Sequence, residues 1–339
     1  MTIRTPLTTA LGTQAPIIAA PLGRGSSPQF VAAVADAGAF GFVGLMHVPE
    51  TQVAQQLETY NRTVGAGRFG VNLTLIRDQH RRLDAALEAG VRVVSLWYGD
   101  PTSYVAAAKA ANATVFWTVG TAEDAARATD LGVDFVVCQG REAGGHLVGA
   151  AGQMSLLPNV VDAAERVPVV AAGGIADGRG LAAALSLGAV GVWMGTRFVA
   201  SNESASHTGY KGRLVHAEPS DLVETRLFDG GWPDSPHRVI RNSTVTEWED
   251  AGRPLPGSRP HEGEPIGRYP DGRPFLRYTD ASPWDSFDGD WEAGPHYAGE
   301  SVQLVRDIDS VRNIVDDAVR DAEQALRRAI SMSDPEQVG

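Results

Sequence analysis

The segment AAGGIADGRG (171–180) and the run VGVWMGTRF (190–198) decide the fold of this chain. Each contains a short apolar run that ends in glycine, and a helical stretch, GRGLAAALSLG (178–188), lies between the two runs. A strand, a helix and a second strand in succession form the repeating unit of a parallel sheet. In a parallel β/α barrel, the loops after the last two strands commonly bind phosphate. The two segments therefore predict the last two strands of such a barrel.

The same unit repeats through the preceding chain. From about residue 15 to 198, apolar runs rich in Val, Ile and aromatic residues alternate with Ala-rich helical stretches, and the runs lack polar alternation, as strands buried on both faces should. The expected strands are 15–21, 39–45, 68–73, 91–99, 114–120, 134–140, 168–175 and 190–198. The expected helix N-caps are Ser27, Thr102, Thr121 and Asp177. An open doubly wound sheet is the alternative, but eight strands favour a closed TIM (β/α)8 barrel.

Residues 215–300 break this pattern. They are dense in Pro, Gly, Trp, Asp and Arg and show little periodicity. So long an irregular segment is either disordered or a functional lid, and its aromatic residues argue against disorder. We therefore predict a β/α barrel at 1–214, an irregular lid over the barrel mouth at 215–300, and a C-terminal segment at 301–339. The last segment contains a helix, roughly 307–331, that packs on the outside of the barrel.

The composition excludes several classes of partner. The chain has 339 residues and a formal net charge of −12, which argues against nucleic acid and anionic membranes. No apolar run reaches 18 residues, and the N-terminus makes a poor signal peptide. The single cysteine, Cys138, excludes an intrachain disulfide, so a cytoplasmic location is the default expectation. No histidine falls into a metal-ligand pattern, and we expect no metal.

A candidate catalytic residue follows the sixth expected strand, in CQGREAGGHLVG (138–149). Catalytic groups of β/α barrels lie at the C-terminal ends of the strands. Gly144 and Gly145 allow an unusual backbone path that would present His146 to the cavity. Histidine is the usual general acid or base near neutral pH. A loop histidine bonded to the backbone is the alternative, but the position at the end of a strand favours a functional role.

Further candidate ligand-binding groups lie around the same rim. Asn72 ends the third expected strand and Gln139 the sixth. An amide both donates and accepts hydrogen bonds, which suits the edge of a flavin or nicotinamide ring, although capping of a turn is an equally good interpretation. The phosphate site is expected where glycines free the backbone near a helix N-terminus. Its candidate residues are Gly173, Gly174, Gly195 and Thr196.

Taken together, these motifs resemble those of the FMN-dependent nitronate monooxygenases, formerly called 2-nitropropane dioxygenases. The resemblance rests on APIIAAPLG (15–23), FGVNL (69–73), CQGREAGGH (138–146), VPVVAAGGIADGRG (167–180), WMGTRF (193–198) and HYAGESVQLV (296–305), and so covers nearly the whole chain. It implies that the barrel at 1–214 binds FMN and that His146 is the catalytic residue. The implied FMN contacts are Ala20, Pro21, Asn72, Gln139, Gly144, Gly174, Trp193, Met194, Gly195, Thr196, Tyr297 and Gly299. The family's YAGQ element reads YAGE here, so Glu300 replaces a donor amide with an acceptor.

The resemblance implies that O2 and FMN convert a nitronate or nitroalkane into a carbonyl compound and nitrite. His146 would act as a base toward neutral nitroalkanes, or as a donor that orients the anionic nitronate. FMN-dependent enoyl-acyl-carrier-protein reductases, which use NAD(P)H, share EAGGH and AAGGIADGRG and are the nearest alternative. The segment ETRLFDGGWPDSPHRVIRNS (224–243) favours the monooxygenases over them. A non-catalytic flavin or phosphometabolite-binding protein is the third interpretation, and a homodimer is the commonest default oligomer.

Overall fold

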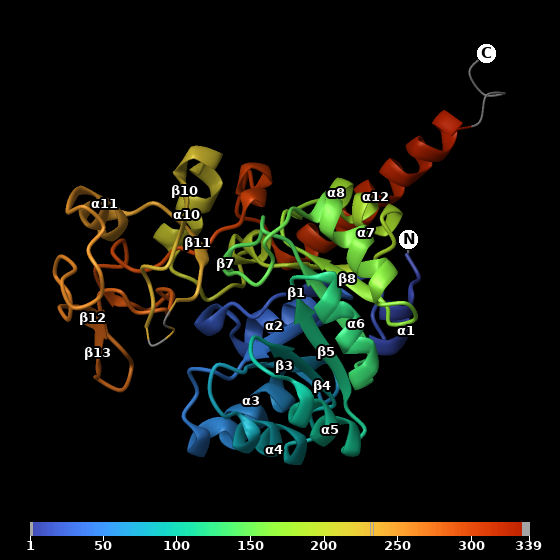
Figure 1. Ribbon diagram of the computed structural model, residues 1–339, viewed down its shortest axis with the longest axis horizontal. Coiled ribbons are helices and arrows are strands. Elements are labelled where there is room, and N and C mark those ends of the chain that lie inside the picture. The colour runs from blue at the N-terminus through green and yellow to red at the C-terminus, as the bar shows by residue number, and fades with distance from the viewer. Residues whose placement is uncertain (1–2, 231, 233, 334–339) are drawn as a thin grey trace.

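The predicted barrel is confirmed. The computed structural model describes residues 3–230, 232 and 234–333; residues 231 and 233 of the predicted lid, and 334–339 of the C-terminal segment, lie outside the described residues. Eight parallel strands close in the order β1-β2-β3-β4-β5-β6-β8-β9 (Figure 1). They are β1 (Ile17–Ala19), β2 (Phe40–Gly44), β3 (Phe69–Thr74), β4 (Val93–Trp97), β5 (Thr114–Val119), β6 (Phe135–Gln139), β8 (Val169–Ala172) and β9 (Gly191–Met194). The barrel closes where Ile18 of β1 pairs with Trp193 of β9.

Helices follow the strands and surround them. They are α2 (Pro28–Asp36), α3 (Val53–Val64), α4 (His80–Glu88), α5 (Thr102–Ala110), α6 (Ala122–Leu131), α7 (Gln153–Ala163) and α8 (Gly178–Ser186). The side chains of Ser27, Thr121 and Asp177 cap their helices as predicted. The prediction for Thr102 was wrong, because Thr102 is the first residue of α5 and its backbone amide donates to Oδ1 of Asp100, 3.1 Å away.

Aromatic side chains fill the inside of the barrel. The rings of Phe42 and Trp193 stack with their centroids 4.6 Å apart, and Phe42 meets Phe116 edge-on at 5.7 Å. Leu7, from the short helix α1 (Pro6–Leu11), belongs to the same buried cluster. Because α1 precedes β1, it closes the N-terminal end of the barrel. The C-terminal end of the strands is left as the place for a ligand.

The last helix, α12 (Val311–Ser333), completes the outer ring. It packs against α8 and α2, so closely that a Cβ on Gly178 of α8 would collide with the α12 backbone. In a β/α barrel, a helix should follow the last strand, β9, and α12 occupies that position in the outer ring. Residues 200–310, which lie between β9 with its short helix and α12, are therefore an insertion in the last β/α connection. The predicted start at 307 was four residues early, because Ser310 Oγ accepts the Asn313 amide at 3.1 Å and the helix begins at Val311.

The insertion (residues 200–310) contains more regular structure than its sequence suggests. Its elements, with the short helix α9 (Thr196–Val199) before it, are α10 (Thr208–His216), β10 (Leu222–Thr225), β11 (His237–Ile240), α11 (Ser243–Asp250), β12 (Pro265–Arg268), β13 (Pro274–Leu276) and β14 (Asp288–Gly289). Short 3₁₀ helices lie at Gly23–Gly25, Glu50–Gln52, Pro219–Asp221 and Glu300–Leu304. Strands of two to four residues are too short to show a periodicity of two in the sequence.

One of the two small sheets joins the insertion to the barrel. It has the order β10-β11-β7, and β7 (Gly145–His146) lies in the loop after β6 of the barrel. His146 pairs with His237 of β11 in this sheet. The second sheet, β13-β12-β14, lies away from the barrel (Figure 1). Among the described residues, no helix has the length and apolar character needed to cross a membrane.

Candidate functional site

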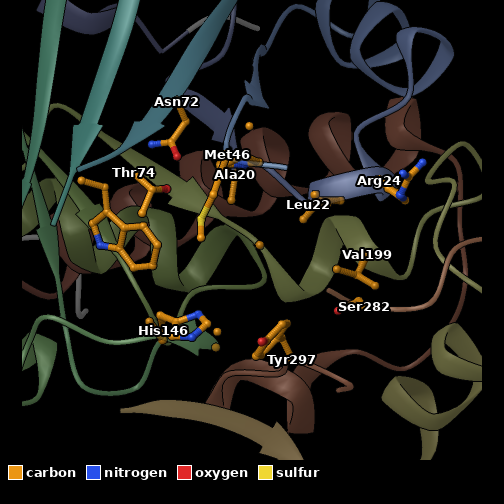
Figure 2. A pocket seen from close by; sticks show the side chains of 18 of the residues that line it. Ala20, Leu22, Arg24, Met46, Asn72, Thr74, His146, Val199, Ser282 and Tyr297 are labelled. Atoms are coloured by element: carbon orange, nitrogen blue, oxygen red, sulfur yellow. The ribbon is translucent and has the colours of Figure 1, made fainter. Parts of the chain in front are cut away.

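A cavity of about 600 Å³ lies at the C-terminal end of the barrel strands. Val137, Ala172 and Trp193, which belong to the apolar cluster inside the barrel, form part of its wall. Figure 2 shows Asn72, His146 and other lining side chains around the open space. Loops of the barrel and residues of the insertion both contribute to the lining. An apolar cavity with a few polar side chains at this end of a β/α barrel is the usual form of an active site.

The structure brings the predicted site residues together, with one exception. Those that line the cavity are Ala20, Pro21, Asn72, Gln139, Gly144, His146, Gly173, Gly174, Trp193, Gly195, Thr196, Tyr297 and Gly299. Met194 does not, because side chains alternate along β9: Trp193 points into the barrel, and Met194 points out among the helices. Only its backbone reaches the rim, where its carbonyl oxygen accepts the Ala20 amide at 2.9 Å. A contact from the Met194 side chain to a ligand in the cavity is therefore excluded.

The glycines after β8 form a tight turn that can cradle an anion. Gly173 and Gly174 have φ values of +102° and +73°, a region that favours glycine. Within the described residues, the backbone amides of Gly174 and Ile175 donate to no acceptor. Thr196 begins the next helix after β9, and its Oγ1 accepts the Gly299 amide at 3.0 Å, so its hydroxyl proton is available to a ligand. These groups suit a phosphate.

The two predicted amide side chains have different partners. Asn72 donates from Nδ2 to Ser95 Oγ at 3.2 Å, and its side chain points toward the cavity in Figure 2. Gln139 instead holds the loop that follows its strand: its Nε2 donates to the His146 carbonyl at 3.2 Å, and its Oε1 accepts the Val148 amide at 2.8 Å. Asn72 is therefore free to accept from a ligand, whereas Gln139 first of all positions the His146 loop.

His146 lies in an aromatic, largely dry environment. Its side chain is buried, and its ring centroid lies 4.0 Å from that of Trp232 and 5.6 Å from that of Tyr297. Burial is the main cause of a pKa well below the usual 6.5, and His237 and His47 lower it further. The ring is therefore neutral near pH 7. Its Nε2 is buried with no hydrogen-bond partner among the described residues, which is unusual for a structural histidine.

Glu300, where the family has glutamine, does not line the cavity. Its carboxylate lies 3.4 Å from the guanidinium of Arg238, a side chain that is only 6% exposed. Arg238 donates to the Ala143 carbonyl at 2.8 Å and also to the Arg141 carbonyl, and it pairs with Glu224. Glu300 therefore helps to balance the charge of a buried arginine that holds the loop before His146.

Several lining residues were missed by the sequence analysis. Met46 and His47 follow β2, and Trp232 and Asp280 come from the insertion. His47 and Asp280 both line the cavity, and Nε2 of His47 lies 3.7 Å from Oδ2 of Asp280. Met46 and His47 directly follow the expected strand 39–45, so their place at the end of a strand was a usable signal. Trp232 lies in the segment 224–243, which was used only for the resemblance, and Asp280 lies in an irregular stretch without a motif.

Comparison with known proteins gives a match to one protein family and a similar protein with another name. The sequence profile described as nitronate monooxygenase matches residues 45–321. A (3aS,4S,5R,7aS)-5-hydroxy-7a-methyl-1-oxo-octahydro-1H-indene-4-carboxyl-CoA dehydrogenase from Rhodococcus jostii is 37% identical over 252 residues, which cover 74% of this chain and 69% of that protein.

Two solved structures match over nearly their whole length. FabK from Thermotoga maritima has 28% sequence identity and a TM-score of 0.79, and the match covers 98% of this chain and 100% of that one. A nitroalkane oxidase from Streptomyces ansochromogenes has 26% identity and a TM-score of 0.76, with 96% of this chain and 99% of that one covered. The insertion is therefore matched together with the barrel.

Proposed function

Because this chain belongs to the nitronate monooxygenase family, we propose that it binds FMN in the cavity and oxidises nitronates with O2 to a carbonyl compound and nitrite. The observation that carries the proposal is His146, a neutral, buried histidine whose Nε2 has no partner among the described residues, on the wall of a cavity whose rim can cradle a phosphate. The similarity to a nitroalkane oxidase supports the same reaction class.

The residues present fit FMN. We assign its phosphate to the Gly173–Gly174 turn and to Gly195 and Thr196, where backbone amides and a hydroxyl are available as donors. We assign its ring system to the side of the cavity that holds Asn72. When bound, FMN supplies the redox chemistry, while the protein binds, orients and polarises the substrate.

His146 is suited to orient an anionic substrate. A neutral imidazole has one N–H donor, and a donor placed in a dry cavity stabilises negative charge far better than the same donor does in water. The β7–β11 pairing and the Gln139 side chain hold the His146 backbone, so the ring needs little reorganisation when a ligand binds. The aromatic rings of Trp232 and Tyr297 exclude water from its surroundings.

Two measurements test the proposal. The purified protein should be yellow, and denaturation should release FMN. Ethyl nitronate or propionate 3-nitronate in air should then give nitrite in proportion to the substrate consumed. A colourless protein that cannot be reconstituted with FMN would contradict the cofactor assignment. A yellow protein that releases no nitrite would contradict the reaction.

A second candidate is an FMN-dependent oxidoreductase that acts on an acyl thioester. It is supported by the identity to a protein named as a carboxyl-CoA dehydrogenase and by one feature of the cavity. Arg24 lines the cavity with its guanidinium 4.7 Å from the ring of Trp284, and no carboxylate of the described residues lies within ion-pair distance of it. An arginine without a carboxylate partner suits the phosphates of a thioester carrier. Oxidation of NADPH by crotonyl-CoA, without nitrite formation, would favour this candidate.

A further inference from the structure

We propose that Gln153, the first residue of α7, is a positioning residue that fixes the phosphate turn (Gly173 and Gly174) relative to the His146 loop (residues 140–152, which follow β6). The inference rests on the proposed function, because that function assigns the phosphate of FMN to this turn. Gln153 does not line the cavity, so it can act on a ligand only through the two segments that it holds.

The side-chain amide of Gln153 joins the ends of two neighbouring barrel strands. Its Nε2 donates to the carbonyl oxygen of Cys138 in β6 and to that of Ala172 in β8, both at 2.9 Å. Both N–H hydrogens of the amide are therefore used. The thiol of Cys138 donates to Oε1 at 3.4 Å, which suits the acceptor end of the amide. Because the side chain is buried, these bonds are stronger than they would be in water.

The two carbonyl groups lie directly before the segments that form the site. Ala172 is followed by the phosphate turn. Cys138 is followed by Gln139, whose side chain donates to the carbonyl oxygen of His146 at 3.2 Å. Gln153 therefore fixes the point from which each of the two segments leaves the barrel.

The phosphate turn and the His146 loop are in direct contact. A Cβ placed on Gly173 would lie 2.9 Å from the Ala143 amide nitrogen and 3.0 Å from the Gly140 carbonyl oxygen, so the two backbones leave no room for a side chain. The Gly140 amide also donates to the Ala172 carbonyl oxygen at 2.8 Å. Because backbones packed this closely transmit a displacement, a shift of the turn also moves the loop.

The backbone of Gln153 holds the same loop at a second point. Its amide donates to Oε1 of Glu142 at 2.7 Å. Gly152, the N-cap of α7, has no side chain to cap the helix, and the carboxylate of Glu142 takes this role at the helix N-terminus. The Glu142 carbonyl oxygen accepts the Glu300 amide at 2.8 Å. Gln153 is therefore bonded to both segments, through its side chain and through its backbone.

This arrangement fixes the position of the phosphate site relative to His146. The turn is assigned to the phosphate of FMN and His146 to the substrate, so their separation decides how cofactor and substrate meet. A misplacement of 1 Å between reacting groups can cost about a hundredfold in rate. Loss of the Gln153 amide should therefore weaken the phosphate site and slow turnover, whereas a residue that only docks α7 on the barrel would affect Tm alone.

Gln153→Met tests this role, because methionine has a similar length but no donor. FMN and riboflavin differ only by the phosphate, so the ratio of their Kd values reports the contribution of the phosphate site. In fluorescence titrations, we expect the ratio of riboflavin Kd to FMN Kd to fall about tenfold, the effect of one hydrogen bond to a charged group, with the riboflavin Kd within about twofold of the wild type. With FMN at saturation, kcat for ethyl nitronate should fall at least about tenfold.

Gln324→Met is the matched control. Gln324 is exposed on α12 and does not line the cavity, so this variant should give the Kd ratio and the kcat of the wild type. Tm is measured for each variant, and the titrations are made well below it.

Gln153→Glu keeps the shape of the side chain and tests the donor directly. Its carboxylate has no hydrogen for the two carbonyl groups, whereas the protonated carboxyl has one. Burial beside two carbonyl oxygens raises the pKa of this carboxyl. We therefore expect its Kd ratio, relative to that of the wild type, to rise as the pH is lowered from about 8 to about 5.5.

The outcomes separate this proposal from the proposed function. An unchanged Kd ratio or an unchanged kcat in Gln153→Met, equal weakening of FMN and riboflavin binding, or a Gln153→Glu ratio that does not depend on pH would overturn the role of Gln153. A wild type that binds riboflavin as tightly as FMN overturns the assignment of the phosphate to the turn. A wild type that binds FMN more tightly but releases no nitrite overturns the reaction, and the Kd ratios still decide the role of Gln153.

Discussion

Replacement of Arg238 by methionine tests how the loop before His146 is held. Arg238 is 6% exposed and donates to the carbonyls of Ala143 and Arg141, while its charge faces Glu224 and Glu300. Methionine has a similar length but no donor. Each lost hydrogen bond from a charged group is worth about 1.5–3 kcal/mol, but the two glutamates are partly exposed and remain hydrated, so we expect a total loss of about 3 kcal/mol.

This loss converts into a measurable shift in Tm. With an unfolding entropy of about 2.1 cal/mol/K per residue, a chain of 339 residues has about 0.7 kcal/mol/K, so that 3 kcal/mol lowers Tm by about 4 °C. The assay is thermal unfolding of the FMN-loaded protein, together with nitrite formation from ethyl nitronate. We also expect turnover to fall, because the carbonyls that Arg238 binds belong to the loop that leads to His146.

Glu300→Gln is the matched comparison, since it restores the residue found in the family. Glu300 is 48% exposed and pairs with Arg238 at 3.4 Å, so its loss should cost no more than about 1 kcal/mol and about 1 °C in Tm. A Tm of Arg238→Met within 1 °C of the wild type, or a larger effect of Glu300→Gln than of Arg238→Met, would refute the assignment of the buried arginine as the main support of this loop.

Three further predictions concern the cavity and the buried histidines. His146→Asn should leave FMN bound but slow nitronate oxidation by about a hundredfold, as measured by the visible spectrum and by nitrite release; unchanged turnover would remove His146 from the reaction. Gly173→Ala should weaken FMN binding at least about tenfold in a fluorescence titration. The reason is that φ at Gly173 is +102° and the new Cβ would lie 2.9 Å from the Ala143 amide nitrogen. Gly212→Ala is the control and should bind FMN like the wild type, because its Cβ meets nothing within 4 Å. Burial lowers the pKa of His237 to about 4 and that of His296 to about 3, below the unfolded value of about 6.5, so the unfolded chain binds more protons between these values. Their contribution to stability is therefore fully present above pH 6.5 and is lost as the pH falls toward 4, and a Tm that does not fall between pH 7 and pH 5 would contradict this.

The barrel could be predicted from the sequence because each strand and each helix has a recognisable pattern within a short stretch of residues, and this pattern repeats along the chain. A strand covered on both faces must be apolar throughout, and eight such runs separated by helical stretches left few alternatives. The anion cradle was predictable for a similar reason, since Gly173 and Gly174 adopt backbone conformations that favour glycine. His146 was found from its place at the end of a strand. Met194 shows the limit of a motif, which locates a segment but does not tell which side chains of a strand face inward.

The rest of the site depends on contacts between segments that are far apart in the sequence. Asp280 and His47 are more than 200 residues apart in the sequence but lie close together in the fold. Glu300 and Arg238 are also brought together only by the folded chain, and the sequence around either residue does not predict the contact. The burial that changes the proton affinity of His146 comes from Trp232 and Tyr297 of the insertion. A lone aspartate or histidine in an irregular segment has no periodic neighbours, and its role becomes visible only when the partner is in place.

The pairing of β7 with β11 has a consequence for how such enzymes diversify. The dipeptide Gly145–His146 belongs to the barrel by sequence but forms the outer strand of a sheet whose other two strands come from the insertion. A domain graft that exchanged the insertion for that of a relative would also change the hydrogen bonds that hold the histidine. Substrate range and the alignment of His146 are therefore inherited together, and we expect chimeras to retain turnover only when the β6–β7 loop is transplanted with its partner strand.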